Sequence, residues 1–118
     1  DLVPSECNGL EFCQGTVAEM EPETTVEAVR RFTEQGKIFY VHFRNVRGGF
    51  PKFDEVFIDE GDVNMIAALK AYRDAGYDGV ITPDHTPRVV GDEEYGHRGR
   101  AFALGYIRAG MQALELLD

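Results

Sequence analysis

Apolar side chains follow two kinds of pattern along this chain. Short runs of apolar, aromatic and β-branched residues, which predict strands, lie at 10–13, 37–43 and 79–82. Apolar residues spaced by three or four positions, which predict helices, lie at 24–36, at 62–76 and after residue 96. A strand followed by a helix, three times over, is typical of right-handed βαβ units around a parallel sheet. The sequence therefore predicts an α/β fold.

Polar residues and glycines predict where the helices begin and end. Thr24 or Thr25 can cap the first helix, and Gly36 can end it. Asp62 is expected to cap the second helix and Gly76 to end it. Two helix faces are expected to be buried: Met65, Ile66, Leu69 and Tyr72 in the second helix, and Leu104, Ile107, Met111 and Leu114 in the third.

The connections between these elements are unequal in length. The chain returns from helix to strand over only a few residues, whereas the segments that leave the strands are long or polar, as at 44–61 and 84–96. We expect 44–61 to be irregular except for a short strand at 55–58. The run at 37–43 is almost continuously apolar, which predicts a strand buried on both faces. Long segments after the strands place function at the C-terminal ends of the sheet.

Three residues able to bind a metal occupy equivalent places in the three units. Cys13 ends the first strand, His42 ends the second, and Asp84 follows the third. Parallel strands bring these ends together, and a thiolate, an imidazole and a carboxylate suit a borderline divalent metal such as Zn²⁺, Mn²⁺, Fe²⁺ or Co²⁺. Each residue also has a structural interpretation: a buried thiol, a hydrogen-bonded histidine or a turn-capping aspartate.

Neighbouring residues could act on a substrate. His85 is a candidate general acid or base because its side chain titrates near neutral pH, although it could equally be a surface histidine. Arg44 could hold an anionic substrate through paired hydrogen bonds, or it could pair with acidic side chains. The segment 95–100 combines glycines with basic side chains at the start of the last helix, but it matches no phosphate-binding motif.

Composition narrows the class of protein. The net charge of −9 opposes binding to nucleic acid or to anionic membranes, and no apolar run approaches the ~20 residues needed to span a bilayer. Two cysteines, Cys7 and Cys13, are too few for a disulfide framework and are expected to be free thiols. We therefore expect a cytoplasmic protein. The 118 residues form at most one domain, and the start without methionine suggests a piece of a longer protein.

Five segments in order resemble one enzyme family, the mannonate dehydratases of the metal-dependent UxuA type. They are Gly9–Thr16, Val41–Val46, Phe57–Asp62, Pro83–His85 and Tyr95–Ala101. The resemblance runs over essentially the whole chain. It implies a (β/α)8 TIM barrel of the xylose-isomerase kind, with residues 1–118 as a single partial domain that holds its last three βα units.

The resemblance also implies a reaction and roles for particular residues. The family dehydrates D-mannonate to 2-dehydro-3-deoxy-D-gluconate in hexuronate breakdown, with Mn²⁺ or Fe²⁺ as the metal. By motif match, Cys13, His42 and Asp84 correspond to metal ligands, and His85 and Tyr95 to the pair that transfers protons. A further metal ligand is expected from an earlier strand outside this chain.

Other expectations concern the substrate and the assembly. Arg44 is our candidate for orienting the substrate carboxylate. The full-length enzyme is expected to be a homo-oligomer, and the isolated chain to be inactive because an open piece of barrel has unpaired edges. Two alternatives stay open: a metal-dependent sugar isomerase or epimerase on the same barrel, and a non-catalytic α/β binding module.

Overall fold

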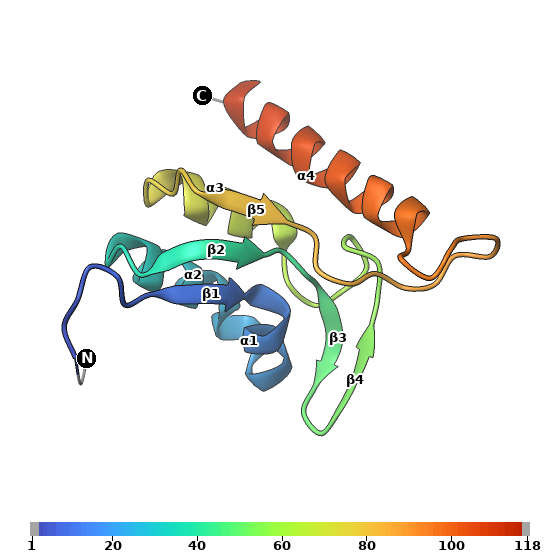
Figure 1. Ribbon diagram of the computed structural model, residues 1–118, viewed down its shortest axis with the longest axis horizontal. Helices are drawn as coiled ribbons and strands as arrows, with labels where there is room; N and C mark the ends of the chain where they lie inside the picture. The colour runs from blue at the N-terminus through green and yellow to red at the C-terminus, as the bar shows by residue number, and fades with distance from the viewer. Residues whose placement is uncertain (1–2, 117–118) are drawn as a thin grey trace.

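Three parallel strands form the central sheet of the computed structural model, which describes residues 3–116. Strand β2 (Ile38–His42) lies in the middle, between β1 (Leu10–Cys13) and β5 (Val80–Thr82). Their C-terminal ends therefore meet at one edge of the sheet (Figure 1). The predicted α/β class and all three strands are confirmed. The chain start Asp1–Leu2, on which part of the expectation of a longer protein rests, lies outside the described residues.

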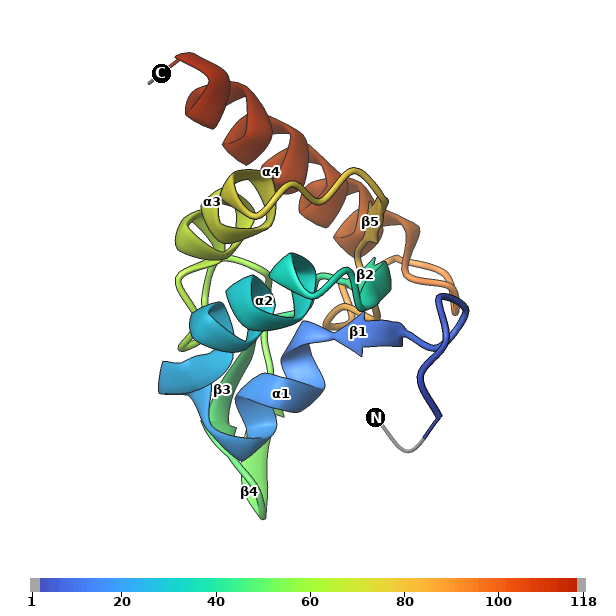
Figure 2. The ribbon, with the colours of Figure 1, turned by 90° about the vertical axis from the view of Figure 1, so that its left-hand side faces the viewer.

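The helices gather on one face of this sheet (Figure 2). They are α1 (Gln14–Met20), the 3-10 turn η1 (Pro22–Thr24), α2 (Thr25–Glu34), α3 (Met65–Asp74) and α4 (His97–Leu116). Phe12 and Val41 face them and are buried, and the rings of Phe12 and Phe32 lie 6.1 Å apart. The expectation that the middle strand is buried on both faces is wrong for the described chain, because Phe39 is 48% and Tyr40 36% exposed.

The helix ends follow the predicted glycines but only one of the predicted caps. Gly36 and Gly76 end α2 and α3 with φ of +64° and +81°, values that glycine adopts without strain. Thr24 precedes α2, as expected, although its side chain makes no capping hydrogen bond. The cap of α3 is Asn64, whose Oδ1 accepts from the Ala67 N–H at 3.0 Å. Asp62 is therefore not the cap.

A β-hairpin occupies the segment after β2 that was expected to be irregular. Strands β3 (Val46–Gly49) and β4 (Lys52–Glu55) pair antiparallel, so the strand expected at 55–58 is wrong. Asp62 holds the hairpin because its carboxylate accepts from the Gly48 N–H at 2.7 Å. The two strands consist largely of polar residues and glycine, so they lack the alternation of apolar and polar residues that predicts a strand.

A buried asparagine holds the loop between the hairpin and α3. Asn45 is 2% exposed, and its amide donates to the Ile58 and Val63 carbonyls at 2.9 and 3.1 Å. Its Oδ1 accepts from the N–H groups of Val46 and Val63, both at 3.1 Å. All four hydrogen bonds of one amide therefore fix a loop that has no regular secondary structure.

Two helices differ from their predicted form. Helix α1 begins directly after Cys13, where a polar loop was expected. In α4, Ile107 and Leu114 are buried as predicted, but Leu104 and Met111 are exposed. The predicted face of α3 is buried at Met65, Leu69 and Tyr72, while Ile66 lies at the exposed margin, next to Gly110 of α4.

Candidate metal centre and proton-transfer site

The three predicted metal ligands converge at the C-terminal edge of the sheet. Cys13 and His42 are register partners at the ends of β1 and β2, and Asp84 follows β5 by two residues. One ligand atom from each lies within 4.8 Å of the other two. The Cys13 thiol donates to Asp84 Oδ2 at 3.7 Å, and all three side chains are half-buried. Thiolate, imidazole and carboxylate donors at this spacing fit a borderline divalent transition metal.

An acidic side chain outside this group of three supports His42. Glu11 lies on the same face of β1 as Cys13, and its Oε1 is 3.1 Å from His42 Nε2. A carboxylate that accepts from a ligating imidazole fixes the direction of the ring and makes the ring a better ligand. Glu11 therefore binds one of the two ring nitrogens of His42, Nε2. Cys7 and Cys13 are both free thiols, as predicted.

Arg44 lies next to Asp84 and pairs with several carboxylates. Its side chain is 8% exposed, NH1 donates to Glu55 at 2.7 Å, and NH2 donates to Glu19 at 2.5 Å. Its Nε is 3.4 Å from Asp84 Oδ2. Burial lowers the pKa of Arg44, but electrostatic interaction with Cys13 and with the two glutamates outweighs burial and raises the pKa above its ordinary value. Arg44 is thus a fixed positive charge.

This placement bears on the expected substrate role of Arg44. Both terminal nitrogens already bind carboxylates, so a substrate carboxylate could bind them only by exchanging with Glu19 or Glu55. The alternative of pairing with acidic side chains describes what Arg44 does in this structure. Its role toward a substrate stays a prediction.

His85 lies beside Asp84, and its ring is held by Glu55. Its Nδ1 is 2.7 Å from Glu55 Oε2, and its Nε2 is 3.4 Å from Asp84 Oδ2. Half of the side chain is exposed, so the ring can be reached by a substrate. The structure therefore places His85 where a proton could pass between it and a molecule bound at the metal ligands.

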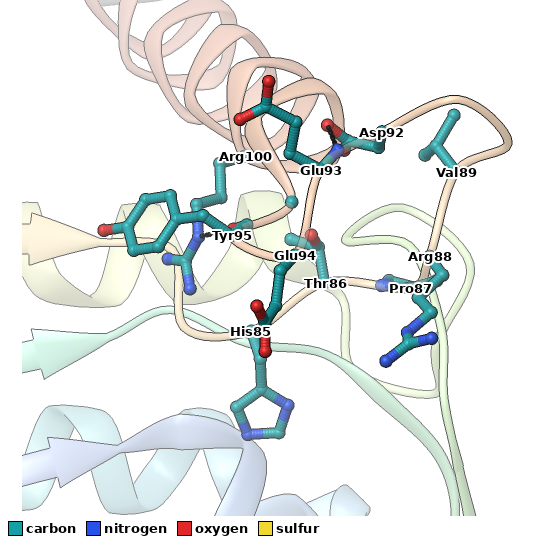
Figure 3. Close-up of a pocket in the computed structure, with 11 residues that line it drawn as sticks. His85, Thr86, Pro87, Arg88, Val89, Asp92, Glu93, Glu94, Tyr95 and Arg100 are labelled. Atoms are coloured by element: carbon teal, nitrogen blue, oxygen red, sulfur yellow. Dashed lines mark hydrogen bonds between the residues drawn. The ribbon is translucent and has the colours of Figure 1, made fainter.

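Tyr95 and His85 line the same cavity but do not touch. The cavity has a volume of about 480 Å³ and lies between the segment after β5 and the start of α4. The phenol ring of Tyr95 is stacked under Arg100, whose guanidinium carbon is 4.5 Å from the ring centroid. Figure 3 shows the imidazole of His85 pointing away from that ring. Tyr95 is 64% exposed, and its catalytic role stays a prediction.

Sequence reasoning missed Glu11, which supports His42, and three residues around Arg44. Glu19 and Glu55 bind Arg44, and Gly15 leaves the space through which the Arg44 side chain passes. Glu55 could have been noticed as an acidic residue within an expected strand, but its partners come from other elements. Glu19 gave no signal, since α1 itself was not predicted.

Comparison with known proteins shows the family to which the chain belongs. A family model described as D-mannonate dehydratase (UxuA) matches residues 1–117. The chain belongs to the D-mannonate dehydratase family. Within residues 3–116, no helix has the length and apolar character needed to cross a membrane.

Individual relatives of this family match nearly the whole chain. Mannonate dehydratase 2 of Halalkalibacterium halodurans is 34% identical over 120 residues, covering 97% of this chain and 35% of the relative. Mannonate dehydratase of Enterococcus faecalis is 35% identical over 121 residues, covering 97% of this chain and 33% of the relative. The chain therefore spans about a third of the length of these curated relatives.

A solved structure of the same family shares the fold. The crystal structure of mannonate dehydratase from Streptococcus suis serotype2 matches with a TM-score of 0.85 and 30% identity. The match covers 97% of this chain and 36% of that chain. The sheet, the helices and their connections thus occur together as a part of a larger enzyme of this family.

Proposed function

We propose that the protein carrying this chain dehydrates D-mannonate to 2-dehydro-3-deoxy-D-gluconate in hexuronate breakdown in the cytoplasm. The observation that carries the proposal is the convergence of Cys13, His42 and Asp84 within 4.8 Å, with His85 beside them. Membership of the D-mannonate dehydratase family supports the reaction and the substrate class, a sugar acid.

Cys13, His42 and Asp84 would hold Mn²⁺ or Fe²⁺, with a further ligand from outside this chain. When bound, such a metal supplies Lewis-acid stabilisation of negative charge on substrate oxygens, worth several kcal/mol. Glu11 fixes the imidazole of His42, and Arg44 offsets part of the negative charge behind Asp84. Arg44 could also orient the substrate carboxylate by exchanging one of its glutamate partners for it.

The reaction removes a proton from C2 of the aldonate and the hydroxyl from C3. The electron pair of the C2–H bond forms the C2–C3 double bond, the hydroxyl leaves with a proton as water, and the enol becomes the 2-keto acid. His85 and Tyr95 divide these proton transfers, each worth about 10²–10⁴-fold when well placed. The cavity between them can hold a small sugar acid.

The open face of the sheet supports a barrel. Three parallel strands with helices on one face, and the metal ligands at the C-terminal ends, are what the last three βα units of a (β/α)8 barrel would look like. Other strands of the full-length protein would cover the face that carries Cys13 and His42. We further propose that the full-length enzyme is a homo-oligomer.

Testing this function needs the longest reading frame that contains the chain. The purified protein, supplied with Mn²⁺ or Fe²⁺, is incubated with D-mannonate, and the 2-keto-3-deoxy acid is measured. We expect formation of that acid, and its loss in His85→Asn with bound metal retained. An isomerised or epimerised sugar without keto acid, or a protein that binds no metal, would refute the proposal, as would normal turnover in His85→Asn.

A further inference from the structure

Glu55 connects two parts of the site, Arg44 and His85, that no local sequence pattern links. It is the last residue of β4, so the hairpin that follows β2 carries it back to the sheet edge. Its Oε1 accepts from Arg44 NH1, and its Oε2 binds His85 Nδ1, both at 2.7 Å. One carboxylate therefore spans a buried cation and the candidate acid/base.

Arg44 fixes the orientation of the Glu55 carboxylate. Arg44 is 8% exposed and is held in turn by Glu19 of α1 and by Asp84. A guanidinium presents its donors in a rigid planar fork, so the oxygen that it binds has little freedom. The second oxygen of Glu55 is consequently directed at His85.

A directed acceptor determines how His85 can be used. A carboxylate only accepts hydrogen bonds, and Glu55 Oε2 lies closer to Nδ1, at 2.7 Å, than Asp84 Oδ2 lies to Nε2, at 3.4 Å. The proton of a neutral His85 therefore lies on Nδ1 and the lone pair on Nε2. Nε2 is the nitrogen nearest the metal ligands, 3.4 Å from Asp84 Oδ2. The contact therefore places the reactive nitrogen of the ring on the side where substrate would bind.

We propose that Glu55 is a positioning residue that holds the His85 imidazole in one orientation and one tautomer for proton transfer. The proposal rests on the proposed function for the reaction. It also assigns a role to the β3–β4 hairpin, which places Glu55 beside His85. Glu55 acts through His85 and takes no proton from the substrate itself.

The structure provides a matched control for this role. Glu19 and Glu55 each bind one terminal nitrogen of Arg44, but of these two glutamates only Glu55 also contacts His85. Glu19→Ala and Glu55→Ala therefore remove the same kind of partner from Arg44 and differ in their effect on the imidazole. Glu55→Gln keeps the size of the side chain and one acceptor oxygen, so it tests the role with little change in packing.

The kinetic test uses the longest reading frame that contains this chain, loaded with Mn²⁺. We expect Glu55→Ala to lower kcat about 10- to 100-fold, with KM for D-mannonate and metal content nearly unchanged. Glu55→Gln should keep more activity than Glu55→Ala, and Glu19→Ala should lower kcat much less. An equal loss in Glu19→Ala and Glu55→Ala would show that both act by supporting Arg44, which would overturn the proposal.

A second measurement does not depend on turnover. Long-range ¹H–¹⁵N spectra of the metal-free protein at alkaline pH report the tautomer of the His85 ring. We expect the Nδ1–H form in the unsubstituted protein and in Glu19→Ala, and a tautomer mixture in Glu55→Ala. The same tautomer in all three proteins would overturn the proposal. If D-mannonate is not consumed but the tautomer still depends on Glu55, the function is wrong and the positioning contact stands.

Discussion

Gly15→Ala is the substitution for which the structure makes the sharpest prediction. Gly15 lies in the first turn of α1, where the Arg44 side chain crosses the helix. A Cβ at this position would lie 2.3 Å from Arg44 Nε, 2.9 Å from Cζ and 3.0 Å from Arg44 Cβ. These distances are too short for contacts with a side chain whose two ends are both fixed. Arg44 must therefore move away from its three carboxylate partners.

Two effects of opposite sign determine the change in stability. Replacing glycine by alanine within a helix stabilises it by about 0.5–1 kcal/mol. Breaking a buried ion pair costs about 3–5 kcal/mol, but Glu55 is 40% exposed, so we discount the loss to about 2–3 kcal/mol. The second effect exceeds the first, and we expect Gly15→Ala to lower the free energy of unfolding by about 1–2 kcal/mol.

Urea unfolding of the longest reading frame that contains the chain measures this change. Gly105→Ala is the matched control, because Gly105 lies within α4 and, apart from its chain neighbours and the adjacent helix backbone, no described atom is within 4 Å of the added Cβ. The control should raise the urea midpoint at an unchanged slope of the free energy against urea concentration. Gly15→Ala should lower the urea midpoint. If Gly15→Ala stabilised the protein as much as Gly105→Ala, Arg44 would not be held as the structure places it, and the reasoning would be wrong.

Three further predictions concern other parts of the chain. Cys13→Ala and His42→Ala should each abolish tight metal binding, which elemental analysis after dialysis measures; full metal content in either variant would contradict the ligand assignment. Asn45→Ala should lower the free energy of unfolding by about 2–4 kcal/mol, measured by urea unfolding, because it leaves buried backbone groups without partners. Desolvation raises the pKa of Asp92, but hydrogen bonds from backbone N–H groups, first that of Arg98, outweigh it and lower the pKa. Asp92 therefore stabilises the fold above its unfolded pKa, and this contribution is lost as pH falls through the lower folded pKa; a carboxyl titration by NMR that gave an ordinary or raised value would contradict this.

The convergence of the three candidate metal ligands could be predicted because it depends on topology alone. Parallel strands align their C-terminal ends whatever the side chains around them, so finding Cys13, His42 and Asp84 at equivalent places was enough. The helix ends at Gly36 and Gly76 could also be predicted, because the residue after a helix often has a positive φ, which glycine adopts more readily than other residues.

The polar support of the site could not be predicted from periodicity. The hairpin strands are short and polar, and they are held by Asp62 and Asn45, which come from outside them. Asp62 was an acceptable cap for α3 on local grounds, but its carboxylate binds Gly48 across the loop, and Asn64 caps the helix instead. Such choices are decided by partners distant in the sequence, which no local pattern records.

Charge around Arg44 links the buried network to the metal site. Glu19, Glu55 and Asp84 all lie within ion-pair distance of this one cation, and Glu11 adds a fourth carboxylate beside His42. A single guanidinium cannot neutralise four carboxylates gathered at one sheet edge, where the field is screened less than in water. A divalent cation among the three ligands would offset the remaining negative charge. The carboxylates that pair with Arg44 leave it little capacity to bind a further anion. Their negative charge favours a metal cation at the adjacent position, among Cys13, His42 and Asp84.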